Sequence, residues 1–235
     1  MARVFLFLAA NGTGDADAAR GRLIEAASVE VDRLRGACDP GTALRFYTQL
    51  DSDVLANAAE GMRPAAATIE IEAPPGHALH TLAPVLAGFA ERLAGALDCA
   101  GSTAVAGHSR IVIDGPAQPL CYRYLMRRRS DFQQADYLDY YVNHHFRFAL
   151  KTGGITRYTQ FYVDQQASQH WAGVTGLKHR RLDSISELHL SSQEEFLQAA
   201  MQSIDNSLAA KQDELVFVDV AQSQMFTSIL RSDAL

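Results

Sequence analysis

The stretch Ile113-Asp-Gly-Pro-Ala-Gln-Pro119, near the middle of the 235-residue chain, decides how the sequence is divided. Its two prolines and one glycine stop regular structure, so it marks the best candidate boundary between two parts. We therefore expect a first half, 1–114, and a second half, 119–235, each of ordinary domain length. Outward from this boundary, both halves show the same order of expected elements.

In the first half, hydrophobic periodicity predicts a strand, a helix, two strands, a helix and a strand. The predicted ranges are Val4–Ala10, Asp15–Cys38, Ala43–Leu50, Ala65–Glu72, His77–Leu97 and Thr103–Ile113. Asp15 is the expected N-cap of the first helix. The polar turn Asn11–Asp15 comes too early for a secretory leader, so we prefer a strand at the N-terminus to a signal peptide.

In the second half, the same order of elements is predicted again. The ranges are a strand at Leu120–Arg128, a helix at Phe132–Lys151 opened by Ser130 or Asp131, strands at Ile155–Asp164 and Ser184–Leu190, a helix at Gln193–Ser207 and a strand at Val216–Ile229. A duplicated β-α-β-β-α-β order predicts the α+β class, as two tandem ferredoxin-like halves with helices on one face of each sheet. The bare faces must be covered, so we expect them to pack sheet to sheet as a single-chain α+β barrel, an internal pseudo-dimer.

Composition excludes several classes of function. The net charge of -6 disfavours binding of nucleic acid. No apolar run approaches the ~18 residues of a membrane span, so a cytoplasmic protein is expected. The three cysteines are far apart and lack CxxC spacing, which predicts neither disulfides nor a zinc site.

Five pieces of the second half resemble the EthD family in order and spacing. They are Tyr124–Arg128 with Phe132, Tyr137–His145, Ile155–Gln160, Asp183–Leu190 and Asp213–Asp219. The resemblance covers about Leu120–Leu230 and implies a dimeric α+β barrel. It also implies a chemistry among those of the group, which includes cofactor-free polyketide cyclases, anthrone dehydratases, lactone isomerases, quinone-forming monooxygenases and heme-binding members. The first half lacks the tyrosines and paired histidines of the family helix, so the resemblance transfers at most one site.

The run Tyr140-Tyr-Val-Asn-His-His145 is the expected centre of the chemistry. At about 100° per residue, Tyr141 and His145 share the helix face toward the sheet, whereas His144 lies about a quarter turn away. His145 is therefore the predicted buried acid-base group, with Tyr141 beside it and His144 at the margin. A buried imidazole stays neutral near working pH and suits proton transfer. The alternative is a core histidine bonded to a backbone carbonyl.

Other side chains are predicted to complete the site. His189 is a second acid-base candidate, because it shares a strand face with Asp183 and Glu187; a solvated or interfacial strand face is the alternative. The substrate-binding candidates are Tyr124, Arg128, Arg157, Tyr158, Trp171 and Asp183. Strand alternation does not reveal which face of the first strand the helix covers. Trp171 belongs to the stretch 165–180, which either lids the pocket or is an ordinary packed insertion.

A bound metal or cofactor is not predicted. Adjacent histidines diverge on a helix, unlike the i, i+4 pair of zinc enzymes, and His77 and His80 lack further ligands nearby. Heme held by one histidine is an alternative that the wider fold group implies. Dinucleotide, phosphate-loop, nucleophile-elbow and HExxH motifs are missing from the sequence.

The sequence thus predicts a cofactor-independent enzyme of aromatic compound metabolism, acting on a small hydrophobic aromatic or polyketide-like molecule by His/Tyr acid-base catalysis. A lyase of the dehydratase kind or an isomerase or cyclase is expected, and a cofactor-free monooxygenase is a further alternative. A carrier or accessory protein that binds without reacting, or an assembly scaffold, is the non-enzymatic alternative. Pairing of two pseudo-dimers into a homodimer is left open.

Overall fold

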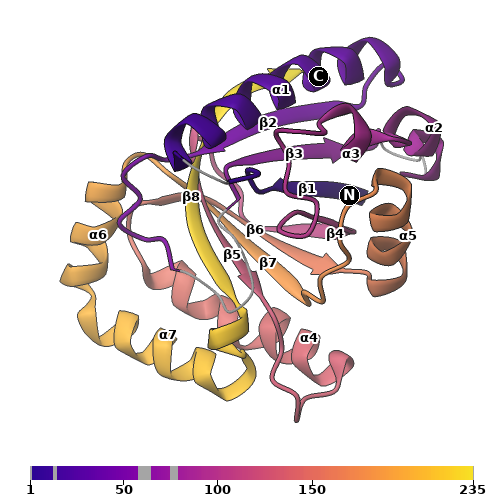
Figure 1. Ribbon diagram of the computed structural model, residues 1–235. Helices are drawn as coiled ribbons and strands as arrows, with labels where there is room; N and C mark the ends of the chain where they lie inside the picture. The colour runs from indigo at the N-terminus through magenta and orange to yellow at the C-terminus, as the bar shows by residue number, and fades with distance from the viewer. Residues whose placement is uncertain (1, 13–14, 58–64, 75–78, 235) are drawn as a thin grey trace.

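The computed structural model describes residues 2–12, 15–57, 65–74 and 79–234. Within these ranges, eight antiparallel strands close into one barrel in the order β1-β3-β2-β8-β5-β7-β6-β4 (Figure 1). The strands are β1 Ala2–Leu8, β2 Ala43–Gln49, β3 Ala67–Glu72, β4 Thr103–Ile113, β5 Leu120–Met126, β6 Ile155–Val163, β7 Ser184–Leu190 and β8 Gln224–Ala234.

Each half contributes one four-stranded ferredoxin-like sheet, β4-β1-β3-β2 in the first and β8-β5-β7-β6 in the second. The edge pairs β2–β8 and β4–β6 join the two sheets, so no edge strand of the barrel is left open. This arrangement confirms the predicted α+β class and the single-chain barrel. The division at 114 and 119 stays a prediction, because the two sheets share one interior.

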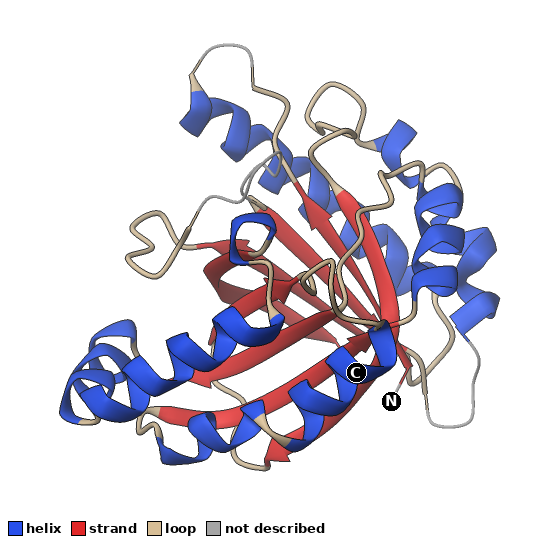
Figure 2. Cartoon of the chain, turned by 90° about the horizontal axis from the view of Figure 1, so that it is seen from below, coloured by secondary structure: helices blue, strands red, loops and turns tan. Residues whose placement is uncertain are grey.

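Helices cover the outside of the barrel (Figure 2). They are α1 Ala16–Ala37, α2 Ala83–Leu86, α3 Phe89–Arg92, α4 Gln134–Asn143, α5 Gln165–Thr175, α6 Gln193–Gln202 and α7 Ile204–Phe217, with the 3-10 segments η1 Leu79–Leu82, η2 His145–Lys151 and η3 Val220–Gln222. The first sheet is covered by α1, α2, α3 and α5, and the second by α4, η2, α6 and α7. No helix of the described residues is both long and apolar enough to cross a membrane.

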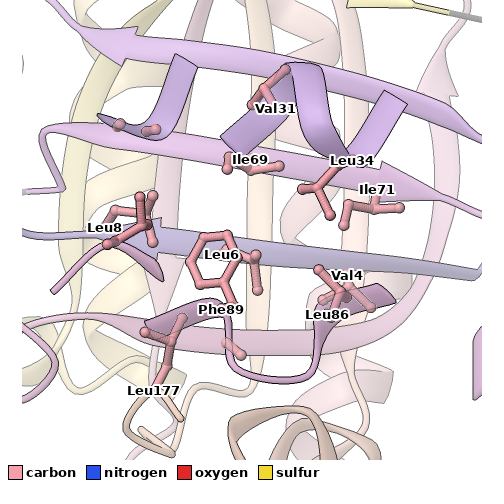
Figure 3. Packing of buried hydrophobic residues seen from close by; sticks show 14 of the residues in the cluster. Val4, Leu6, Leu8, Val31, Leu34, Ile69, Ile71, Leu86, Phe89 and Leu177 are labelled. Carbon is pink, nitrogen blue, oxygen red and sulfur yellow. The ribbon is translucent and has the colours of Figure 1, made fainter. Parts of the chain in front are cut away.

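The outer face of the first sheet is closed by a continuous apolar core. Asp15 caps α1 by accepting from the backbone N–H groups of Asp17 and Ala18, as predicted. Leu23, Ala27, Val31 and Leu34, three or four residues apart, line the buried side of that helix. They pack on outward-facing strand residues such as Leu6 and Ile69 (Figure 3). The apolar side of α1 is therefore packed directly on the sheet.

Two predicted long helices are wrong in their continuity. The range His77–Leu97 is broken into η1, α2 and α3, because Pro84 opens α2 and Gly88 adopts a left-handed φ of 70°. His77 itself lies outside the described residues. The range Phe132–Lys151 divides into α4 and η2, and α4 begins after Gln133 rather than at Ser130 or Asp131.

The predicted end of the chain also requires correction. The range Gln193–Ser207 contains a break at Ser203 between α6 and α7. The strand predicted from Val216 is wrong, because α7 continues to Phe217, whose ring is fully buried against Tyr137 and Tyr140. The last strand, β8, begins only at Gln224.

The insertion between β6 and β7 does not cover the second-half sheet. It forms α5, which packs on β4 and contacts α2 and α3 of the first half. Trp171 is 2% exposed and belongs to the first-half core with Phe89 and Leu177. The prediction that Trp171 forms a wall of the substrate pocket is therefore wrong; the packed-insertion alternative describes it.

The barrel interior combines an aromatic layer with an ionic layer. Phe5 and Phe161 meet edge to face at 5.0 Å in the first. In the second, Arg3 contacts Glu70 and Glu187, each at 2.6 Å. Arg123 reaches the same Glu187 at 3.2 Å. These four charged side chains are at most 6% exposed and come from both halves, so the layer links the two sheets.

Removing one charge from this layer is expected to destabilise the fold. Glu187→Gln leaves two buried guanidinium groups undercompensated, and we expect a loss of about 3–5 kcal/mol in the free energy of unfolding. Asp233→Asn is the matched control, because Asp233 is 42% exposed in its pair with Arg45. The control should lose about 1 kcal/mol or less in urea unfolding. Equal losses in both variants would contradict a stabilising ionic layer.

Candidate functional site

A cavity of about 540 Å³ lies between the outer face of the second sheet and the segments η2, α6 and α7. Its volume lies in the range of small-molecule sites, about 300–1,000 Å³. Strands form the floor and helical segments form the walls. Most of the lining is apolar. The polar or titratable side chains that carry its chemistry are Tyr122, Tyr124, His145, Tyr158, Lys211 and Glu214.

Strand alternation brings three tyrosines to the cavity floor. On β5, Tyr122 and Tyr124 point outward, whereas Arg123 points into the barrel. On β6, Tyr158 likewise points outward, and its hydroxyl lies 3.4 Å from that of Ser186 on β7. Strand alternation alone left undecided which face of β5 the helices cover. In the structure they cover the face that carries Tyr124.

His145 stands at the start of η2, in the cavity wall. Its Nδ1 lies 2.8 Å from Oδ2 of Asp213 on α7. The other oxygen of that carboxylate accepts the hydroxyl of Tyr140 at 2.7 Å. Because a carboxylate only accepts, the hydrogen is placed on Nδ1, and Nε2 is left as an unprotonated acceptor. This arrangement fixes one tautomer of the imidazole.

Burial keeps the imidazole neutral. The His145 side chain is 12% exposed, and its ring lies 5.0 Å from the ring of Phe217 and 5.7 Å from that of Phe148. Loss of solvation lowers the pKa of His145 below its ordinary value, and the bond to Asp213 opposes this shift without reversing it. At neutral pH the side chain is therefore suited to accept a proton.

A change of helix type separates the two adjacent histidines. Helix α4 ends at Asn143, His144 leaves helical geometry with φ -119° and ψ -54°, and η2 follows. His144 is exposed and lies beside Tyr140, with the ring centres 5.2 Å apart. The positions agree with the predicted ones, His145 inside and His144 at the margin, although the continuous helix used to predict them is absent. Their catalytic roles stay predictions.

Glu214 adds a second titratable group to the wall. It follows Asp213 on α7, so the two carboxylates diverge, one toward His145 and the other into the cavity. Burial raises the pKa of Glu214 to about 7; nearby Lys211 opposes this shift and Asp213 adds to it. The group is thus partly protonated at neutral pH and can donate a proton.

Tyr124 has an unsatisfied hydroxyl. The residue is 4% exposed, and among the described residues its hydroxyl has no hydrogen-bond partner. A buried polar group without a partner is costly and requires an explanation, such as a ligand atom. Burial, together with the charge of Glu214, raises the pKa of the phenol, so it stays a donor. It is placed to bind an oxygen of a bound molecule.

A loop of the first half roofs this second-half cavity. Val54, in the loop after β2, lies over its mouth. The side chain of Asp53 accepts from the amide of Gln193 at 2.7 Å. Asn57 pairs with the backbone of Met225 through two hydrogen bonds, of 2.6 and 3.1 Å. These bonds hold the loop on β8 and α6, so both halves contribute to the site.

His189 and Arg157 do not reach this cavity. Both line a separate polar cavity of about 450 Å³ at one mouth of the barrel. Nδ1 of His189 lies 3.0 Å from the carbonyl oxygen of Gln118. Its expected partner Glu187 is engaged by Arg3 and Arg123 instead. The prediction that His189 joins His145 in one site is therefore wrong, because the two lie on opposite sides of the sheet.

Three further predicted residues lie outside the lining of the main cavity. Arg128 and Asp183 form a buried ion pair that joins the end of β5 to the start of β7. The hydroxyl of Tyr141 lies 2.8 Å from that of Ser186, and Tyr141 is fully buried between α4 and the sheet. We therefore assign structural roles to these three in place of substrate contact.

Sequence reasoning missed the roles of Asp213 and Glu214. The predicted helix ends at Ser207 and the predicted strand begins at Val216, so the sequence analysis places Asp213 and Glu214 between the two elements. The helical spacing of apolar residues in 204–217 extends to Phe217. This pattern is the signal that could have placed Asp213 and Glu214 on a helix. Among the described residues, no three His, Cys, Asp or Glu side chains gather closely enough to hold a metal ion.

No family model matches the sequence, and no curated protein is significantly similar to it. An anthrone oxidase-like protein superposes with a TM-score of 0.61 at 14% identity, over 99% of this chain and 92% of that one. A candidate monooxygenase from Lactobacillus acidophilus gives 0.53 at 12% identity, over 99% and 95%. A dye-decolorizing peroxidase from Bacteroides thetaiotaomicron gives 0.52 at 11%, over 97% and 92%. These similarities establish the dimeric α+β barrel fold, and the resemblance to EthD stays a prediction.

The raised pKa of Glu214 predicts how stability depends on pH. The folded protein holds the proton of Glu214 more tightly than the unfolded chain does. The stability that this protonated carboxyl contributes to the fold is therefore fully present below about pH 4.5 and is lost as pH rises through about 7. In Glu214→Gln the side chain is neutral at every pH. The free energy of unfolding of this variant, measured in urea, should therefore rise relative to that of wild type by roughly 1–3 kcal/mol between pH 5 and 8. The exposed Glu195→Gln is the control. Parallel pH curves for wild type and Glu214→Gln would contradict the assignment.

Proposed function

We propose that this protein is an enzyme that transfers protons on a small aromatic or polyketide-like molecule bound in the second-half cavity. One arrangement supports this most directly. His145, held in one tautomer by Asp213, presents a free Nε2 in a cavity whose floor carries the unpartnered hydroxyl of Tyr124. A base and a hydrogen-bond donor in one apolar cavity suit the formation of an enolate or phenolate.

The lining of the cavity supports an aromatic substrate. Phe148, Phe196 and Leu188 offer apolar surface, and the tyrosine rings of the floor offer faces for stacking. Few polar groups are present, so a molecule with one or two oxygens and a largely apolar body fits the chemistry of the walls. A strongly charged substrate would lose most of its solvation there, and Lys211 is the lining cation that could pair with it.

In the proposed reaction, Nε2 of His145 removes a proton from an activated carbon or a phenol. The electron pair moves onto the conjugated oxygen, which Tyr124 stabilises by donating a hydrogen bond. Protonated Glu214 then gives its proton to a departing hydroxyl, which leaves as water, and the net reaction is a dehydration. If the proton returns to another carbon, the net reaction is an isomerisation. If the enolate attacks a carbonyl of the same molecule, the net reaction is a cyclisation.

Each proton acceptor and donor of this scheme is a side chain of the protein. Asp213 positions the base and stabilises the imidazolium that forms after proton abstraction. Tyr140 binds the second oxygen of Asp213 and so fixes the carboxylate. We therefore propose that the reaction needs no cofactor.

A cofactor-free monooxygenase is the second candidate. Two of the similar structures are described as a monooxygenase and as anthrone oxidase-like. The first step would be the same, because His145 would form the carbanion of a phenolic substrate. The carbanion would then give electrons to dissolved O₂, and loss of water from the resulting peroxide would leave a quinone.

Anthrone tests the shared first step, since its methylene protons are acidic and exchange in D₂O can be followed by NMR. Wild type should accelerate this exchange, and His145→Ala should lower the enzymatic rate about 10²–10⁴-fold. His170→Ala, at an exposed position of α5, is the matched control and should exchange at the wild-type rate.

Three outcomes separate the candidates. Exchange without oxygen uptake supports the lyase and isomerase class, and uptake of one O₂ per anthraquinone formed supports the monooxygenase. Equal exchange rates in wild type and His145→Ala would remove His145 as the base. Binding of anthrone with no exchange in wild type would favour a carrier protein.

A further inference from the structure

We infer that the substrate carries an extended apolar tail, which leaves the cavity between Val54 and Met201 and lies in a groove along α6. The inference rests on the proposed function for one point, that the reactive polar end of the molecule binds inside the cavity. It adds a substrate class: a phenolic or polyketide head with an attached alkyl chain.

The groove and the cavity are continuous. The groove, of about 580 Å³, runs along the outer side of α6, and seven residues border it. Three of these, Val54, Leu197 and Met201, also line the cavity. A molecule that fills the cavity past these side chains therefore enters the groove without crossing polar surface.

The shared side chains are unusually exposed for apolar residues. Val54 is 69% exposed, Met201 70% and Leu197 38%. A single exposed aliphatic residue is ordinary, but a contiguous apolar patch at the mouth of a cavity marks a binding surface. Methionine is unbranched and adapts to ligands of varied shape. These features fit a flexible hydrocarbon chain better than a rigid polar group.

Polarity changes along the path. The titratable groups His145 and Glu214 and the free hydroxyl of Tyr124 lie in the cavity. The groove is bordered by three apolar side chains, by the uncharged amides of three glutamines and by one carboxylate, Glu194. A polar head is thus recognised inside, whereas an uncharged tail suits the groove. The opposite orientation would leave the hydroxyl of Tyr124 without a partner.

A second protein copy fits the groove less well than a tail does. Seven bordering residues are about a third of the 20–30 that each side of a standard protein interface uses. The roof over the gap is also fixed, since Asp53 and Asn57 tie the loop carrying Val54 to α6 and β8. The passage beside Val54 and Met201, which both line the cavity and the groove, suits a narrow apolar chain.

Binding of 4-alkylphenols, from methyl to nonyl, measured by calorimetry on the intact protein, tests this inference. In wild type, Kd should fall roughly fourfold for each methylene buried and then level off when the chain passes the end of the groove. Met201→Gln and Val54→Ser should abolish the gain in affinity for the longer chains, and should change Kd for 4-methylphenol far less, because these two side chains stand where the cavity meets the groove. Leu208→Gln on α7, where Leu208 is 52% exposed and outside the groove, is the matched control and should keep the wild-type series.

Tyr124→Phe distinguishes the head from the tail. It should weaken all members of the series by the same factor and leave the gain per methylene intact. If it changes nothing, the proposed head site fails while the tail site stands. If Met201→Gln keeps the full chain-length dependence, the tail site fails. Dimers of wild type that Met201→Gln dissociates in sedimentation, or no binding by any alkylphenol, would also overturn the inference.

Discussion

The ion pairs inside the barrel are the constraint on which the rest of the structure depends. Arg3 and Glu70 come from the first half, and Arg123 and Glu187 from the second. Buried charges are tolerated only when they are paired, so the two sheets can close only in the register that brings these four together. A charged interior cannot accept an apolar molecule, because its ions would lose their partners. Among the described residues, a largely apolar cavity lies instead on the outer face of the second sheet, beneath the helices.

The two outer faces use that space differently. In the first half, the unbroken helix α1 places Leu23, Val31 and Leu34 directly on the sheet and fills it. In the second half, the covering segments change helix type at His144 and break at Ser203, and a cavity lies between them and the sheet. The same interruptions deliver His145 and Glu214 to the walls.

Much of this architecture could be predicted from the sequence. Duplicated order and period-2 alternation predicted the sheets, and helical spacing predicted which of the adjacent histidines points inward. Strand alternation shows which residues share a face, but it does not show whether helices or the barrel interior cover that face. Glu187 and His189 were therefore predicted in the same site as His145, although they face the barrel interior. Short apolar runs such as that ending at Phe217 fit a strand or a helix equally, and this ambiguity concealed Asp213. Loop placement, as for Val54, depends on contacts between the halves that periodicity does not encode.

We propose that His145 is a neutral base whose Nδ1 holds a hydrogen in the bond to Asp213 and whose Nε2 is open to the ligand. NMR of ¹⁵N-labelled imidazole groups tests it most directly, with Asp213→Asn as the reference. We predict a single Nδ1–H tautomer at neutral pH, a pKa below the ordinary value of histidine, and a shift of the Nε2 signal when 4-methylphenol is added. A charged imidazole at pH 7, the Nε2–H tautomer, or an Nε2 signal that the phenol leaves unmoved would contradict the account.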